Sequence, residues 1–496
     1  MRARRPFELI VMAVLFVSFD RHVEAQSCPE VPTASVSSAQ PPLDVCLPDD
    51  SGTNFPIDYF DDYSWRAFIA LVWPAANGQR GLPDTTKTVN GPGPRVFETY
   101  KSLWEIFHTD NTAPSSSSFN NYESAQFNAC QQNVNFGDLV LASFSKFSDI
   151  GQAGAGSLVG PLPGQNGLYT RYLTLYNQIE FDKIFQEQWF FRRKLPVVPT
   201  PAPPVPVVQF PAGSIDVKAA WIDLTGMSDA QRQRYYTRQA WVLNPNDGTC
   251  SEKEVGLVGL HIVQKTPSRP QWIWSTFEQV DNVPPAEPGS TGKFAFNDGT
   301  STAMPGKNPL TLSPLAPQPV KPFNVTRSAS TPIHPKTTTT NSKYRNLLAG
   351  TVWANYQLVM TQWPTGQGNQ PVPTSQGGDV GHTCPGVGAV GQTCPSGAAS
   401  AFANVTMETF DQTRVQFGCM SCHAQARNQG DFVWSMLDHA FPPSAATPDL
   451  FFRDTSFKDF QKFMLQAAPP KQTAPPVSNH SAPSARKKST DTSVPK

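Results

Sequence analysis

Residues 256–278 read GLVGLHIVQKTPSRPQWIWSTFE, two stretches rich in β-branched and aromatic side chains separated by the turn residues PSRP at 267–270. Apolar side chains alternate weakly with other residues in 256–264 and again in 271–278, which is the period-two pattern of β-strands. Two such runs on either side of a turn predict an antiparallel hairpin. We therefore expect an antiparallel sheet with this hairpin at its centre.

The N-terminal half of the chain predicts one further strand and three helices. In residues 215–221 apolar and polar positions alternate, which predicts another strand of the sheet. Apolar and aromatic side chains spaced three and four apart predict helices in residues 61–74, 97–107 and 168–193. Packing against the core is enough to explain apolar residues at helical spacing, so we expect these aromatics to be core residues rather than a cofactor-binding site.

The connecting segments are rich in Pro, Gly, Ser and Thr. Residues 195–211 predict an extended connector, and residues 284–343 predict a long surface excursion. A short buried element is expected in residues 347–363, followed by a Gly-rich loop in residues 364–400. The predicted fold class is α+β: a large domain with helices and an antiparallel sheet, plus a small C-terminal, mostly helical segment packed on it.

The first 25 residues have the pattern of a secretory signal peptide. A basic start that includes Arg5 precedes an apolar stretch from Leu9 to Phe19, and the small residue Ala25 closes it. The alternative, an uncleaved anchor helix, is disfavoured by the short apolar run and by Glu8. We therefore expect a periplasmic or secreted protein.

The charge balance argues against two classes of partner, and the hydropathy argues against a transmembrane segment. Lys and Arg number 39 and Asp and Glu number 39, so the chain offers no net field for nucleic acid or an anionic membrane. No later stretch of about 18 or more apolar residues follows the signal peptide, so we expect no transmembrane segment in the mature chain.

The chain contains eight cysteines, of which six lie outside the pair at 419 and 422. An even remainder in an exported chain predicts up to three disulfides. The expected pairs are Cys28 with Cys46, Cys384 with Cys394 and, by elimination only, Cys130 with Cys250. Scattered free thiols are the alternative.

Residues 418–426 read GCMSCHAQA, in which a CxxC pair directly precedes a histidine. Attachment of c-type haem needs this arrangement, because the thiols of Cys419 and Cys422 add to the two haem vinyl groups and His423 then lies under the iron as proximal ligand. We predict one covalent haem c. The alternatives are a redox CxxC or half of a zinc site, but the chain has no second CxxC for zinc.

Four residues are candidates for the distal iron ligand: Met436, His439 and Met464 after the motif, and His261 in the predicted hairpin. The chain between His423 and the tail is too short to cover a haem on both faces. The large N-terminal region should therefore supply part of the pocket. His261 has an alternative interpretation as a buried histidine hydrogen-bonded to backbone.

Polar residues gather around the hairpin beside Trp272 and Trp274. They are Lys265, Ser275, Thr276, Glu278 and Asn282, with Lys218 one strand away. Such a cluster could orient a small substrate near a haem edge. The ordinary polar face of an antiparallel sheet is the interpretation we favour.

These patterns give a predicted domain organisation: 1–25 signal peptide, 26–55 extended arm, 56–400 large mixed α+β domain with long loops, 401–466 haem c-binding segment, and 467–496 disordered tail. The segments SWRAFIALVWP, GLVGLHIVQKT, PQWIWSTFEQVDNVP and GCMSCHAQA together resemble a family of bacterial exported proteins described as the cytochrome c family. The resemblance covers most of residues 60–440. It implies one haem c on a larger mixed domain, at Cys419, Cys422 and His423, and implies no reaction.

The leading hypothesis is an exported monohaem c-type cytochrome that carries single electrons to or from a periplasmic or membrane-bound redox partner. A haem-dependent oxidoreductase, such as an oxidase or peroxidase with a substrate pocket in the large domain, is the first alternative. A binding module that uses the haem as a sensor is the second. A six-coordinate haem favours electron transfer, and an open coordination site favours the enzyme.

Overall fold

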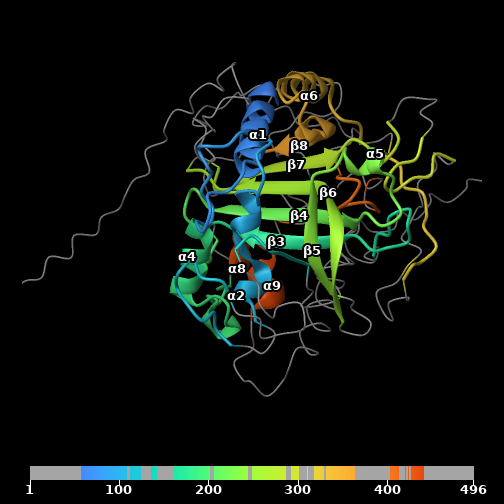
Figure 1. The fold of residues 1–496 in the computed structure, drawn as a ribbon. Coiled ribbons are helices and arrows are strands. Elements are labelled where there is room, and N and C mark those ends of the chain that lie inside the picture. Colours follow the sequence, from blue (N-terminus) through green and yellow to red (C-terminus); the bar gives the residue numbers. More distant parts are fainter. Residues whose placement is uncertain are drawn as a thin grey trace, which may run out of the picture.

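The computed structural model describes residues 57–108, 112–123, 136–141, 161–200, 206–243, 249–267, 269–285, 292–300, 310, 318–328, 331–363, 403–410, 412, 419, 423 and 426–440. Within them the protein has the α+β architecture that the sequence predicts (Figure 1). No helix in these ranges combines the length and hydrophobicity needed to span a bilayer.

An eight-stranded sheet forms the centre of the described structure. Its strands are β1 (Lys101–Ser102), β2 (Leu139–Leu141), β3 (Arg171–Tyr176), β4 (Ile215–Asp223), β5 (Thr237–Leu243), β6 (Cys250–Gln264), β7 (Ile273–Gln279) and β8 (Tyr356–Gln362). The order is β1-β3-β4-β6-β5-β2, and β7 pairs with both β6 and β8. All pairs are antiparallel except β2 with β5, which is parallel, so the predicted antiparallel sheet is confirmed with one exception.

The predicted hairpin is β6 and β7. Strand β6 is long enough that β5 pairs with its first half, while β7 pairs with its second half from Gly259 to Gln264. Strand β4 pairs along the opposite edge. This register puts His261 between Lys218 of β4 and Thr276 of β7.

The helices are α1 (Ile57–Leu71), α2 (Leu103–Ile106), α4 (Gln178–Glu187), α5 (Asp229–Arg232), α6 (Pro335–Leu347), α8 (Arg427–Gly430) and α9 (Ser435–His439), with short 3-10 turns η1 (Phe97–Thr99), η3 (Arg192–Lys194) and η4 (Val352–Asn355). Figure 1 shows α1 running across the strands, with α6 beside it. Phe68 of α1 stacks on Phe277 of β7 with ring centroids 4.5 Å apart. The aromatic face predicted for residues 61–74 is thus a core face, and the helix begins earlier, at Ile57.

Two predicted helices are wrong over part of their length. Residues 97–107 break into η1, β1 and α2, because Ser102 and Glu105 form a capping box that starts a new helix after the short strand. Residues 168–193 contain β3 before α4 begins at its N-cap Asn177. The side chains of β3 are buried on both faces, so their spacing resembled that of a helix.

The predicted surface excursion at 284–343 is also wrong at its end, where α6 begins at Pro335. The threonine-rich sequence of α6 has modest helix propensity, and tertiary contacts with α1 stabilise it. Trp65 of α1 stacks on Tyr344 at 5.3 Å and donates its indole N–H to Asn341 at 3.0 Å.

The buried apolar side chains form two main clusters. The larger one includes the core under α1. The smaller one includes Tyr172, Val258 and Phe296, together with Val405 and Phe410 of residues 403–410. Ser275 of β7 contacts Ser64 of α1, and the next residue, Thr276, contacts Asn404, so residues 403–410 lie on the sheet face opposite α1.

Gly259 allows residues 403–410 to approach β6 closely. A β-carbon at Gly259 would lie 2.4 Å from the hydroxyl oxygen of Thr406, which is itself 2.6 Å from Asn404 Oδ1. We expect Gly259→Ala to lower the free energy of unfolding by about 1–3 kcal/mol, as overpacking does, in a denaturant titration. Adding Thr406→Ala should recover part of that loss. A Gly259→Ala variant as stable as the wild type would contradict this account.

Candidate functional site

His423 lies against the sheet of the large domain. Its imidazole packs on Trp274 of β7 with ring centroids 4.3 Å apart. His423 and Trp274 are 149 positions apart in the sequence. The large domain therefore forms one wall around the histidine of the CxxCH motif.

A backbone hydrogen bond orients the His423 ring. Its Nδ1 lies 2.7 Å from the carbonyl oxygen of Phe432. A carbonyl only accepts, so Nδ1 carries the proton and Nε2 keeps a free lone pair. Burial lowers the pKa of His423 to about 4, so the ring is neutral at pH 7. This tautomer and charge fit a metal ligand that coordinates through Nε2.

The turn that supplies this carbonyl has an uncommon backbone. Asp431 and Phe432 both have positive φ, 51° and 75°, a left-handed region that bulky residues rarely occupy. Contacts hold the turn: Asp431 Oδ2 accepts from the backbone N–H of Phe210 at 2.7 Å and pairs with the Lys265 ammonium, and Phe432 is buried. Such conformations cluster at functional sites, because surrounding structure must maintain them.

Cys419 and His423 both have helical backbone. Cys419 is partly buried and packs against the main core. Cys422 lies outside the described residues. In the part of the chain that is described, no three His, Cys, Asp or Glu side chains form a group that could hold a metal ion.

Of the distal candidates, His261 lies on the same side of the sheet as His423. Its Nε2 is buried without a hydrogen-bond partner among the described residues, and Glu408 Oε1 is 3.6 Å away. Burial lowers the pKa of His261 well below its usual value, and the nearby Lys218 and His423 lower it further. The alternative of a histidine hydrogen-bonded to backbone therefore does not apply to Nε2.

The other candidates have less suitable surroundings. Met436 is fully buried in the main hydrophobic core. His439 lies against the ring of Phe107 at 5.9 Å, and burial lowers its pKa to about 4. Met464 lies outside the described residues.

The polar cluster around the hairpin is not the solvent-facing polar surface that we expected. Lys265, Ser275, Thr276, Glu278 and Asn282 are all buried. Their contacts are structural: Lys265 with Asp431, Ser275 with Ser64, Thr276 with Asn404, Glu278 with Arg327, and Asn282 with the Val258 carbonyl. These bonds join the sheet to its covering segments, because polar groups buried there need partners.

Sequence reasoning missed the residues that support His423. Trp274 was noted only as a neighbour of the polar cluster, and Phe432 and Asp431 were not singled out. No local pattern marks them, because positive φ and ring contacts between distant segments leave no periodic signal.

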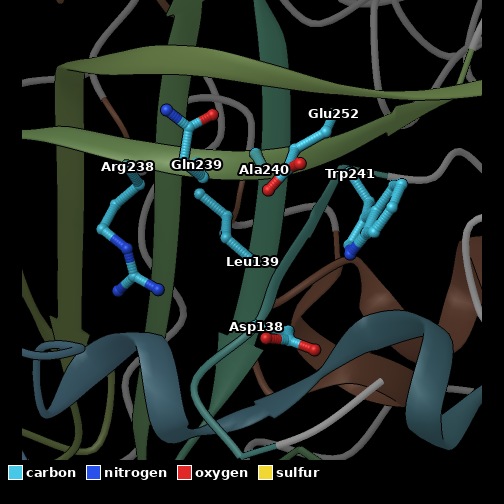
Figure 2. A pocket seen from close by; sticks show the side chains of 7 residues that line it. All are labelled: Asp138, Leu139, Arg238, Gln239, Ala240, Trp241 and Glu252. Carbon is cyan, nitrogen blue, oxygen red and sulfur yellow. The ribbon is translucent and has the colours of Figure 1, made fainter. Parts of the chain in front are cut away.

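A separate pocket of about 280 Å³ lies at the β2–β5 edge of the sheet (Figure 2). It is lined by Asp138, Leu139, Arg238, Gln239, Ala240, Trp241 and Glu252. Arg238 is already paired with Glu98 at 2.8 Å. Glu252 lies nine positions before His261 on β6, about 30 Å along an extended strand, so this pocket is distinct from the surroundings of His423.

Cys250 is disulfide-bonded. The other five cysteines of the predicted pairs lie outside the described residues, so the predicted pairing stays a prediction.

Comparison of the chain with protein-family models, curated proteins and solved structures finds no match. The resemblance to the cytochrome c family stays a prediction from the four sequence segments that carry it.

Proposed function

We propose that this chain is an exported monohaem c-type cytochrome that carries single electrons to or from a redox partner. The haem would be bonded to Cys419 and Cys422, with His423 as proximal ligand. The observation that carries the proposal is the hydrogen bond from His423 Nδ1 to the Phe432 carbonyl, which leaves a neutral ring with Nε2 available. When bound, the haem supplies the one-electron couple.

Of the candidates for the second iron ligand, His261 has the surroundings that would fit best. It combines a buried Nε2 that has no hydrogen-bond partner among the described residues with an electrostatic interaction with His423. A neutral imidazole is the form that coordinates iron, and burial keeps His261 neutral. The large domain would then hold the haem from one side and the C-terminal segment from the other.

The hydrogen-bond acceptor of the His423 ring, a backbone carbonyl, favours electron transfer over peroxide chemistry. A carboxylate bonded to the Nδ1 proton would raise the basicity of the ligand, whereas His423 donates to a backbone carbonyl. The buried rings of Trp274 and Phe432 would also exclude water around the iron. Two axial histidines would leave no open coordination position for a substrate.

The proposal is tested by absorption spectroscopy of the full chain, purified from a bacterial host that attaches haem to exported proteins. We expect a low-spin, six-coordinate spectrum in air, and a reduced spectrum that carbon monoxide changes only slowly. A five-coordinate haem that binds carbon monoxide at once would favour the oxidase or peroxidase instead. Absence of haem from the polypeptide, measured by mass spectrometry, would overturn both.

A further inference from the structure

A group of buried acids lies beside the turn that orients His423. Glu180 of α4 is fully buried, and neither of its carboxyl oxygens has a hydrogen-bond partner among the described residues. Asp216 of β4 and Asp431 are also buried, and Asp431 Oδ1 has no such partner either. A polar group that is buried without a partner is costly, so its retention needs an explanation.

Backbone contacts bring these acids together from three segments. Asn177 Oδ1 accepts from the backbone N–H groups of both Glu180 and Ile215, each at 3.1 Å, which ties the first turn of α4 to the start of β4. The backbone N–H of Lys265 donates to the Ser214 carbonyl at 3.0 Å, which brings Lys265 beside the same strand start.

The Lys265 ammonium connects this group to the candidate site. It pairs with Asp431, the residue directly before Phe432, whose carbonyl orients His423. The charged groups that act on Glu180 are therefore Asp216 from β4, Asp431 from the turn after α8, and Lys265 from the end of β6. Two acids and one cation therefore act on Glu180, and a second cation, Lys218, acts on Asp216.

We propose that Glu180, together with Asp216 and Asp431, is a proton-loading site that takes up a proton from solvent when an electron arrives at the haem held by His423, and releases it when the electron leaves. The proposal rests on the proposed function. Added negative charge at the iron favours the protonated form of nearby acids, and interior charges interact over long distances because the effective dielectric is low. The redox partner supplies the electron, and water supplies the proton.

The protonation behaviour of the acids agrees with this geometry. Burial, then the charges of Asp216 and Asp431, raises the pKa of Glu180 well above its usual value. Burial raises the pKa of Asp216 to about 7, against the opposing effect of Lys218, and raises that of Asp431 to about 6. Asp216 and Asp431 therefore change their proton content near neutral pH, beside a Glu180 that holds its proton more strongly than an ordinary glutamate.

The first test is the pH dependence of the midpoint potential of the full haem-loaded protein. We expect the wild-type potential to fall as pH rises through neutrality, because reduction takes up a proton there. Glu180→Gln should flatten this slope, and Glu180→Gln with Asp216→Asn should flatten it further. Glu187→Gln, the same change at an exposed position of α4, should leave the slope unchanged.

A second test measures how the same acids affect the pH dependence of stability, without any redox change. The folded state holds a proton on Asp216 at pH values where the unfolded chain has lost it, so stability should fall between about pH 4 and pH 7. Glu180, whose pKa is also raised, should add to the fall as pH rises. Glu180→Gln should weaken this fall, measured as the free energy of unfolding at several pH values, while Glu187→Gln should not.

The outcomes separate the two proposals. A haem-loaded protein whose potential depends on pH as strongly in the double variant as in the wild type would overturn the proton-loading site alone. A chain without haem would overturn the proposed function and the coupling, even where the stability of Glu180→Gln changes as expected.

Discussion

Replacing both Cys419 and Cys422 with serine is expected to abolish covalent haem attachment. A thioether forms by addition of a thiol to a haem vinyl group, and a serine hydroxyl does not replace it. Cys419 only borders the main core, so the sheet should still form in the variant. Mass spectrometry of the denatured polypeptide should show the added mass of one haem in the wild type and none in the double variant.

Three control variants belong to this experiment. Cys419→Ser and Cys422→Ser alone should each keep the haem through the remaining thioether, at lower yield. The matched pair Cys384→Ser with Cys394→Ser makes the same two changes outside the motif and should keep the haem fully. Covalent haem in the Cys419 and Cys422 double variant would show that the attachment site is elsewhere in the chain.

Replacing His261 with alanine is expected to convert the haem from six-coordinate to five-coordinate. The change removes the one ring near His423 whose buried Nε2 has no hydrogen-bond partner among the described residues. The variant should become high-spin and should bind carbon monoxide rapidly when reduced, because a coordination position opens. Absorption spectra at neutral pH, with and without carbon monoxide, measure the change.

Two matched variants address the other candidates. His439→Ala removes a histidine that packs on Phe107, and Met436→Leu replaces a buried side chain at nearly constant volume. Both should keep the low-spin spectrum. An unchanged spectrum in His261→Ala, with a high-spin spectrum in either control, would indicate that the sixth ligand lies in the C-terminal segment.

The parts of the fold that sequence predicted well are those in which local pattern and tertiary environment agree. The hairpin of β6 and β7 alternates around a Pro-containing turn, and α1 has an apolar face that packs on the sheet. The prediction failed at β3, where burial on both faces removed the alternation that marks a strand. It failed at α6, whose sequence is stabilised as helix by contacts with α1.

The candidate site also has one part that the sequence predicts and another that only the tertiary structure shows. The spacing of Cys419, Cys422 and His423 is a local property, because haem attachment depends on residues adjacent in the chain, and the sequence alone is enough to predict it. The surroundings of His423 are not local. Trp274 contacts the His423 ring from strand β7, and Phe432 lies in a turn of unusual backbone geometry. Neither arrangement leaves a periodic signal in the sequence.

By itself, then, the sequence determined the hairpin, the α+β class and the position of the CxxCH motif, because each depends on spacing along a few neighbouring residues. Only the tertiary structure decided the tautomer of His423, the location of His261 on the same side of the sheet, and the burial of Glu180. These three features arise from packing between segments distant in the chain, where burial and the need to satisfy polar groups act on side chains that no local pattern connects.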